Sequence, residues 1–167
     1  LAGSIVGLPD EVPWPRSSDV DVMVVTGGEG EHAGAVNAGD VNALPRGKFR
    51  YGGVLLEATL LPEAVLASPE AVLSSYHLAG AFRLDTILSD PTGRLRPLQR
   101  AVSRGFAVRR WVRCRCREAY DKSDAGLAGI APGAPFHAQL NAWAFSTGVM
   151  THVLLVAALR NPTIRLR

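Results

Sequence analysis

Two aspartates at the start of an apolar segment constrain the fold of this chain more than any other feature. The segment runs from Ser17 to Val25 and reads Ser-Ser-Asp-Val-Asp-Val-Met-Val-Val. Side chains alternate between the two faces of a β-strand, so Asp19 and Asp21 point to one side while the intervening valines point into a core. Two carboxylates held so close repel each other unless a cation lies between them. The pattern therefore predicts a buried strand with a site for a hard divalent ion, most simply Mg²⁺.

A third acidic residue, Glu57, lies in a second apolar segment. The segment from Lys48 to Leu61 is predicted to form one strand, and a lone carboxylate in such a strand is costly to bury without a partner. Either Glu57 shares a metal ion with Asp19 and Asp21, or the strand lies at an edge of the sheet and Glu57 faces solvent. The Asp-x-Asp pair also has an alternative, because the junction of a loop and a strand often carries aspartate for a turn.

Three shorter signals lie around these strands. Residues 27–47 are rich in glycine and polar side chains and are predicted to form a long loop. Ser68-Pro69-Glu70 is typical of a helix start, with a serine cap, a proline in the first turn and an acid after it. Residues 84–93 are predicted to form a short strand that runs into an Asp-Pro-Thr-Gly turn.

The last part of the chain is predicted to be helical. The segment from Arg94 to Tyr120 has the apolar periodicity of one long amphipathic helix, and residues 121–135 are predicted to form a linker. The segment from Phe136 to Leu159 is apolar nearly all round. Such a helix is buried against other helices or against a second chain, so we consider a homodimer through the C-terminal helices.

The positive charge of the chain is local. The net charge is +3, and nine arginines and no acidic residue lie between Arg94 and Arg117. This patch could contact a triphosphate, bind nucleic acid or form a solvated basic face, and the sequence leaves all three open. Aromatic residues in the patch are few, so we do not expect a nucleic-acid platform built on base stacking.

Composition favours a globular protein with a core. Hydrophobic residues make up 47% of the 167 residues and charged residues 20%. We expect no membrane span, because no apolar run looks long enough, and no signal peptide, because the start lacks a basic and an apolar region. The two cysteines, Cys114 and Cys116, are poorly spaced for a disulfide with each other, so a reducing cytoplasm is the expected location.

The acidic pattern, together with an upstream Gly3-Ser4, resembles the DNA-polymerase-β-like nucleotidyltransferase superfamily. That superfamily has Gly-Ser, a spacer, Asp-x-Asp on a strand and a third carboxylate on the neighbouring strand, which correspond here to Gly3-Ser4, Asp19-x-Asp21 and Glu57. The turn at residues 90–93 also resembles a segment of its antibiotic and small-molecule members.

The resemblance implies an α+β fold, with a small mixed nucleotidyltransferase sheet and helices, followed by a C-terminal helical region. We expect a nucleotidyltransferase-like domain over residues 1–93 and a helical region over residues 94–167. The strand that precedes Gly-Ser in the superfamily is missing here, so we expect a truncated or processed N-terminus, and the helical region also ends early.

The resemblance further implies Mg²⁺-dependent transfer of a nucleoside monophosphate from a nucleoside triphosphate to a hydroxyl of a small acceptor, as in aminoglycoside- and lincosamide-type enzymes. Asp19, Asp21 and Glu57 would be both the catalytic residues and the ligands of two Mg²⁺ ions. Gly3, Ser4 and Ser18 would bind the nucleotide. The alternative is an inactive protein of the same fold that acts as a binding or antitoxin-like partner.

Overall fold

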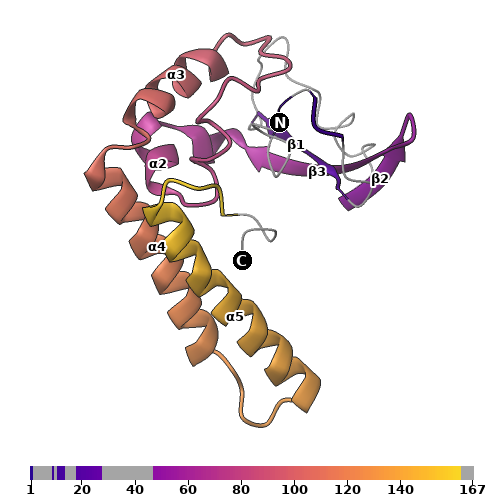
Figure 1. The fold of residues 1–167 in the computed structure, drawn as a ribbon, viewed down its shortest axis with the longest axis vertical. Coiled ribbons are helices and arrows are strands. Elements are labelled where there is room, and N and C mark those ends of the chain that lie inside the picture. Colours follow the sequence, from indigo (N-terminus) through magenta and orange to yellow (C-terminus); the bar gives the residue numbers. More distant parts are fainter. Residues whose placement is uncertain (2–8, 10, 14–17, 28–46, 163–167) are drawn as a thin grey trace. The chain divides into compact units, whose positions relative to one another are not determined.

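The fold was obtained as a computed structural model, which describes Leu1, Pro9 and residues 11–13, 18–27 and 47–162 (Figure 1). The chain separates into two compact units. The sheet unit comprises residues 1–72 and 81–103, and the hairpin unit comprises residues 73–80 and 104–167. The predicted loop over residues 27–47 lies almost entirely outside the described residues, as do Gly3 and Ser4.

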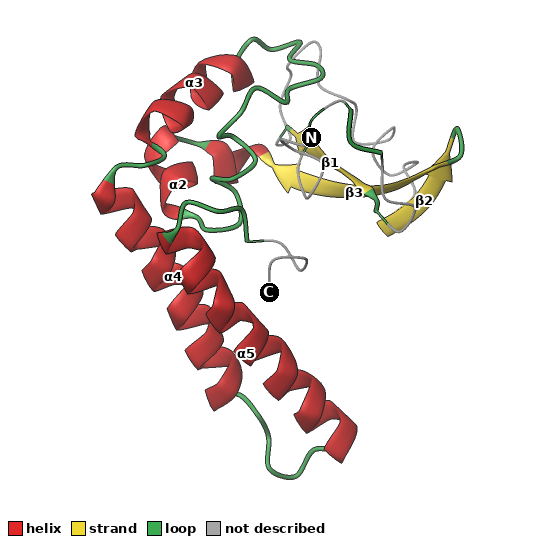
Figure 2. Ribbon diagram, in the orientation of Figure 1, coloured by secondary structure: helices red, strands yellow, loops and turns green. Residues whose placement is uncertain are grey.

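The sheet unit contains a small mixed sheet, shown in yellow in Figure 2. Its strands are β1 (Val20–Thr26), β2 (Gly47–Tyr51) and β3 (Val54–Pro62), in the order β1-β3-β2. The central strand β3 is parallel to β1 and antiparallel to β2. Valine-rich β1 and apolar β3 have the composition that suits a pleated, half-buried surface. The α+β fold with a small mixed sheet is therefore confirmed.

The prediction of one strand over residues 48–61 is wrong, because this segment folds back on itself as a hairpin. Gly52 and Gly53 connect β2 to β3, and both have positive φ angles, of 57° and 83°. A two-residue turn with two positive φ angles twists in the same sense as the strands that it joins, and glycine adopts it without strain. The Gly-Gly pair thus turns a long apolar run into two antiparallel strands.

After β3 the chain forms a short 3₁₀-helix, Glu63–Leu66, and then α2 (Pro69–Ser74). The Ser68 hydroxyl oxygen accepts a hydrogen bond from the backbone N–H of Ala71 at 3.1 Å. This contact is that of an N-cap, since it satisfies a backbone donor that lacks a partner within the helix. The predicted helix start is confirmed.

The predicted strand within residues 84–93 is wrong, although the turn at its end is correct. The backbone N–H of Gly93 donates to the carbonyl of Asp90 at 3.1 Å, and Gly93 has a φ angle of 68°. Upstream, the guanidinium of Arg96 donates to the Asp85 carboxylate at 2.8 Å and to the Ile87 carbonyl at 3.3 Å. A side chain, and not a neighbouring strand, therefore holds this backbone.

The prediction of one helix over residues 94–120 is also wrong. The structure has α3 (Leu95–Gly105) and α4 (Arg109–Ala128), separated by a segment in which Val108 is extended, with ψ at 124°. Gly105 ends α3 where a Cβ atom would lie 2.8 Å from a methyl group of Leu73. The α4 helix then continues through much of the predicted linker.

The hairpin unit consists mainly of α4 and α5 (Phe136–Ala157), which lie side by side and antiparallel (Figures 1 and 2). Small side chains line their contact. Ser123 is fully buried and its hydroxyl donates to the Ser146 carbonyl at 2.8 Å, while Gly126 directly faces the Ser146 side chain. Near the other end, Tyr76, Ala119 and Val156 form a core cluster.

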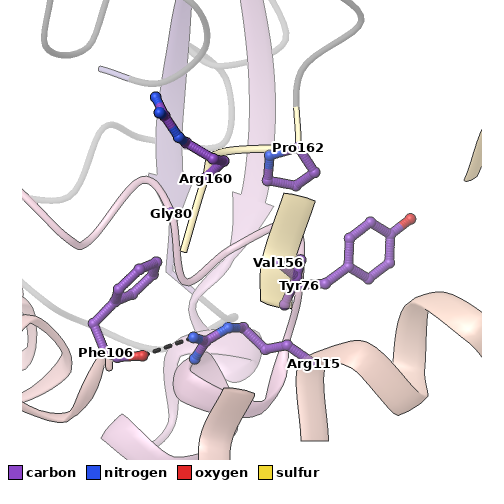
Figure 3. A pocket seen from close by; sticks show the side chains of 7 residues that line it. All are labelled: Tyr76, Gly80, Phe106, Arg115, Val156, Arg160 and Pro162. Carbon is purple, nitrogen blue, oxygen red and sulfur yellow. Dashed lines mark hydrogen bonds between the residues drawn. The ribbon is translucent and has the colours of Figure 1, made fainter. Parts of the chain in front are cut away.

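Arg115 of α4 is buried, with 2% of its surface exposed. Its guanidinium donates to the backbone carbonyls of Leu73 at 2.9 Å and Phe106 at 2.7 Å, and it lies 4.5 Å from the centre of the Phe106 ring (Figure 3). Burial lowers the pKa of Arg115 from its ordinary value. These two carbonyls accept hydrogen bonds from the buried guanidinium and so satisfy its donors. They also tie α4 to the backbone at Leu73 and at Phe106.

By length and composition, α5 is apolar enough to cross a membrane, and 22% of its most apolar window is buried. The expectation that no apolar segment is long enough to span a bilayer is therefore wrong for α5. Core helices pass the same test of length and composition.

Candidate metal centre

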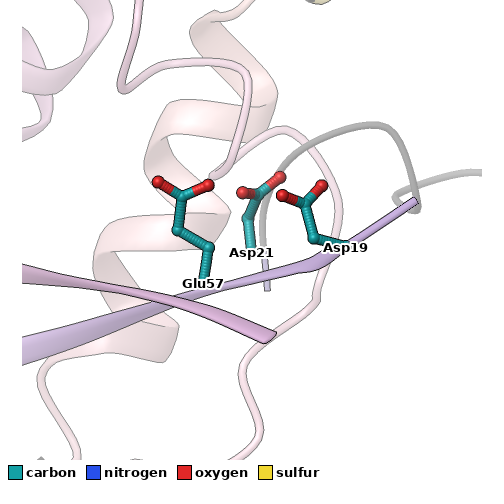
Figure 4. Close-up of side chains that lie close together, drawn as sticks. All are labelled: Asp19, Asp21 and Glu57. Atoms are coloured by element: carbon teal, nitrogen blue, oxygen red, sulfur yellow. The ribbon is translucent and has the colours of Figure 1, made fainter. Parts of the chain in front are cut away.

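Asp19, Asp21 and Glu57 converge at one end of the sheet (Figure 4). Asp21 and Glu57 are partners in the register of the parallel strands β1 and β3, and Asp19 precedes Asp21 by two residues. Side chains two residues apart share a face of a strand, so all three carboxylates point to the same side. One ligand oxygen from each lies within 4.8 Å of the others.

This geometry fits a magnesium ion. Mg²⁺ binds oxygen ligands at about 2.1 Å, so two of its ligands lie at most about 4.2 Å apart. Small rotations of the three side chains would bring their oxygens within that limit. The donor set, three carboxylates and no sulfur or imidazole, is the set that hard divalent cations prefer. With 20% and 37% of their side chains exposed, Asp19 and Glu57 leave the centre open to an entering ion.

A lysine also belongs to this centre. Lys48 of β2 is paired with Glu57 of β3 in the antiparallel register, so β3 lies between the strand that carries Lys48 and β1. Its ammonium group donates to the Asp19 carboxylate and lies 3.4 Å from a carboxylate oxygen of Glu57. Lys48 thus partly neutralises the three acids and occupies carboxylate oxygens that a metal ion would need.

Lys48 was not among the residues predicted for this site, although the sequence contains a signal for it. Gly52 and Gly53 predict a two-residue hairpin turn, in which Tyr51 pairs with Val54. Counting outward from that pair places Lys48 opposite Glu57, as the structure does. A prediction of one strand over residues 48–61 hides this pairing.

The three acids differ in their electrostatic surroundings. Burial raises the pKa of Asp21, and the neighbouring charges of Asp19 and Glu57 raise it further, while Lys48 partly offsets them. By contrast, the hydrogen bond from Lys48 lowers the pKa of Asp19. The pKa of Lys48 is raised by its hydrogen bonds to Asp19 and Glu57. Asp21 is therefore the carboxylate that gains most from an additional cation.

The other predicted site residues are only partly described. Ser18 directly precedes Asp19 and is buried, with 3% of its surface exposed. Gly3 and Ser4 lie outside the described residues. The turn at residues 90–93 is formed, but the structure assigns it no ligand.

Several arginines of the basic segment already have structural partners. In the sheet unit, Arg94 forms an ion pair with Glu63 and Arg96 forms one with Asp85 at 2.8 Å. In the hairpin unit, Arg115 is held by backbone carbonyls. The basic segment therefore serves partly to hold the fold together, and it is divided between the two units.

Comparison of the chain with models of protein families, with curated proteins and with solved structures found no match. The resemblance to nucleotidyltransferases stays a prediction from the sequence.

Proposed function

We propose that this protein is a Mg²⁺-dependent nucleotidyltransferase that transfers a nucleoside monophosphate from a nucleoside triphosphate to a hydroxyl group of a small acceptor. The hydroxyl oxygen would bond to the α-phosphorus, the bond between the α- and β-phosphates would break, and pyrophosphate would leave. One observation carries the proposal. Three carboxylates on adjacent parallel strands, Asp19, Asp21 and Glu57, point to one side with ligand oxygens within 4.8 Å of one another.

The chemistry follows from what these side chains can hold. Asp19 and Asp21 would bind two Mg²⁺ ions, which supply positive charge to the phosphate oxygens during the transfer. Glu57 would complete the ligand set or accept the proton of the attacking hydroxyl. Ser18, buried beside Asp19, would help to position the nucleotide. Phosphoryl chemistry of this kind depends mainly on positioning and on neutralising charge.

Lys48 supports a cation-binding role for the centre. Without a divalent ion, the three carboxylates are only partly neutralised by one ammonium group, which contacts two of them. A divalent ion between the carboxylates would displace Lys48 from Asp19 and Glu57. The freed ammonium group would then be available to the negatively charged phosphates of the nucleotide.

The test is a calorimetric titration with ATP and then GTP, with and without Mg²⁺. Wild type is compared with Asp19→Ala/Asp21→Ala and with Asp121→Ala/Asp124→Ala, a control that removes two exposed aspartates of α4. The proposal is supported if nucleotide binding needs Mg²⁺, is lost in Asp19→Ala/Asp21→Ala and persists in the control. A screen of hydroxyl acceptors would then follow. No nucleotide binding by folded wild-type protein would rule out the catalytic role.

A non-catalytic binding or antitoxin-like role is the second candidate. The exposed apolar side chains of α5, among them Phe136, Trp143 and Leu154, favour it, because they offer a surface to a partner protein. In that case the Asp19→Ala/Asp21→Ala variant keeps its partner binding, whereas an enzyme loses its activity.

A further inference from the structure

The α5 helix carries an exposed apolar stripe along the side that α4 does not cover. Its members are spaced alternately four and three residues apart, and we call them the α5 seam: Phe136, Leu140, Trp143, Thr147, Met150 and Leu154. Phe136, Trp143 and Leu154 expose 78%, 55% and 73% of their surfaces. Alternating spacing of this kind is the seam of a coiled coil, which packs against a second helix.

The seam is distinct from the face that packs on α4. The buried positions of α5 are Ser146, Val149, His152 and Val156. At 3.6 residues per turn, the six seam positions fall within an arc of roughly 80°, whose centre lies roughly 145° from the mean direction of these four. The hairpin unit therefore leaves Phe136, Leu140, Trp143 and Leu154 of the seam exposed, whereas Thr147 and Met150 are half-buried.

We propose that the α5 seam is the interface with a second copy of this chain, in which the two α5 helices pack antiparallel about a two-fold axis. The order of the spacings along the α5 seam is the same in both directions along the helix, so two antiparallel copies can place every seam residue opposite another. With the axis at residue 145, Phe136 faces Leu154 and Leu140 faces Met150 of the second copy. The bulky Trp143 faces the small Thr147, so the seam is complementary to itself in size as well as in spacing.

Charge supports this occupant. The α5 helix contains no Asp, Glu, Lys or Arg, whereas α4 carries several of each sign. A partner of matching character must offer an uncharged apolar helix, and α5 of a second copy is such a surface. Two copies would also bring no like charges together along the seam.

The exposed area is sufficient for a weak, specific dimer. At 150–250 Å² for a large side chain, the exposed parts of Phe136, Leu140, Trp143 and Leu154 amount to roughly 500 Å². Two copies together would bury about 1,000 Å², the lower limit for a specific interface. The paired hairpins would form a layer of four helices in the order α4, α5, α5, α4, with α5 from both copies at its centre.

A lipid bilayer fits the same surface less well. Spanning it would carry α4 along, because α4 packs on α5 over its length, and α4 includes Arg109, Arg113 and Asp121. Charged side chains at the centre of a bilayer are costly. A membrane is therefore an outcome that the experiment must distinguish from a dimer.

The experiment measures the mass of the full chain by sedimentation equilibrium across a range of concentrations. Wild type is compared with Trp143→Glu/Leu154→Glu and with the control Phe145→Glu. Phe145 is 62% exposed on the same helix but lies off the seam. We expect wild type and the control to dimerise reversibly and the seam variant to weaken dimerisation by about 30-fold or more.

Cross-linking tests the antiparallel arrangement with the large apolar side chains Phe136, Trp143 and Leu154 in place. In a Cys114→Ser/Cys116→Ser background, chains with Leu140→Cys are mixed with chains with Met150→Cys and oxidised. Links between the two kinds of chain support the proposal, and links only within each kind would indicate parallel packing and overturn it. The proposal would also be overturned if the wild-type chain stayed monomeric at all concentrations. It would be overturned equally if wild type bound neutral phosphatidylcholine vesicles in a flotation assay and Trp143→Glu/Leu154→Glu did not.

Discussion

Lys48 controls how the acidic centre behaves without a divalent ion. It contacts Asp19 and Glu57 from a third strand, so the charge of the centre depends on all three strands of the described sheet. The centre still holds more negative than positive charge. Lys48 and a metal ion therefore compete for the same oxygens.

Replacing Lys48 tests this competition. We expect Lys48→Met to raise the affinity of the centre for Mn²⁺ by about tenfold, because a like charge is removed from within a few ångströms of the ion. Isothermal titration calorimetry measures the change. The matched control is Lys122→Met, which removes a lysine of α4 and leaves the centre unaltered. An unchanged affinity in Lys48→Met would show that Lys48 does not occupy the ion's position.

The raised pKa of Asp21 predicts a pH dependence of stability. The folded protein holds a proton on Asp21 at pH values where the unfolded chain, with an ordinary value of 3.8, has released it. Stability of the ion-free protein therefore falls as pH rises through this window, from about pH 4 upward. The contribution of Asp19 to stability depends on pH in the opposite direction, because the hydrogen bond from Lys48 lowers the pKa of Asp19. This contribution is lost only as pH falls below that window.

Thermal melts of ion-free protein between about pH 4 and pH 7 measure this effect. We expect the decrease in melting temperature with pH to be smaller in Asp21→Asn, which cannot ionise. Saturating Mg²⁺ should reverse the decrease in wild type but not in the variant. An identical pH profile for both proteins would contradict a raised pKa at Asp21.

The β2–β3 hairpin is the element that places Lys48 and Glu57 opposite each other. Its register depends on a turn of two glycines with positive φ angles. Beyond the neighbouring residues, no atom in the described part of the chain lies within 4 Å of a Cβ atom built on either glycine. A substitution there therefore acts through backbone strain and not through a clash.

We expect Gly53→Ala to lower the free energy of unfolding by about 1–2 kcal/mol, the cost of placing an alanine in a left-handed conformation. Because strain in the turn loosens the register, the Mn²⁺ affinity should fall as well. Urea denaturation and metal titration measure the two effects. Gly133→Ala is the control, since Gly133 has open space around it and no positive φ angle, and it should change neither quantity.

The elements show where prediction from the sequence succeeds. The shared direction of Asp19 and Asp21 was predictable, because alternation along a strand acts locally. The approach of Glu57 was expected only from the resemblance, because it depends on the parallel register of two strands that are distant in the sequence. The break at Gly105 was not, because it depends on the approach of Leu73, which is distant in the sequence. The strand predicted near Ile87 failed for the same reason, since Arg96 holds that backbone.

At the scale of the whole molecule, the candidate metal centre and the α5 seam belong to different units. A ligand that binds the folded state stabilises the part of the structure that must be folded to bind it. Metal binding and dimerisation should therefore protect different segments of the chain.

Hydrogen exchange followed by mass spectrometry measures this separation. We expect Mg²⁺ to slow exchange in β1 and β3 and to leave α5 unchanged. Raising the protein concentration should slow exchange in α5 and leave the strands unchanged. At a ligand concentration 100 times Kd, protection corresponds to about 2.7 kcal/mol. Protection of both regions by Mg²⁺ alone would show that the two units unfold together.

The segment of residues 73–80 belongs to the hairpin unit although the sheet unit lies on both sides of it in the sequence. The carboxylate of Glu118 accepts a hydrogen bond from the backbone of Tyr76, and Arg115 holds the carbonyl of Leu73. No single cut in the chain can therefore release either unit intact. A fragment that starts at residue 104 would leave Ala119 and Val156 without Tyr76, so gene fusions and domain swaps must carry both units together.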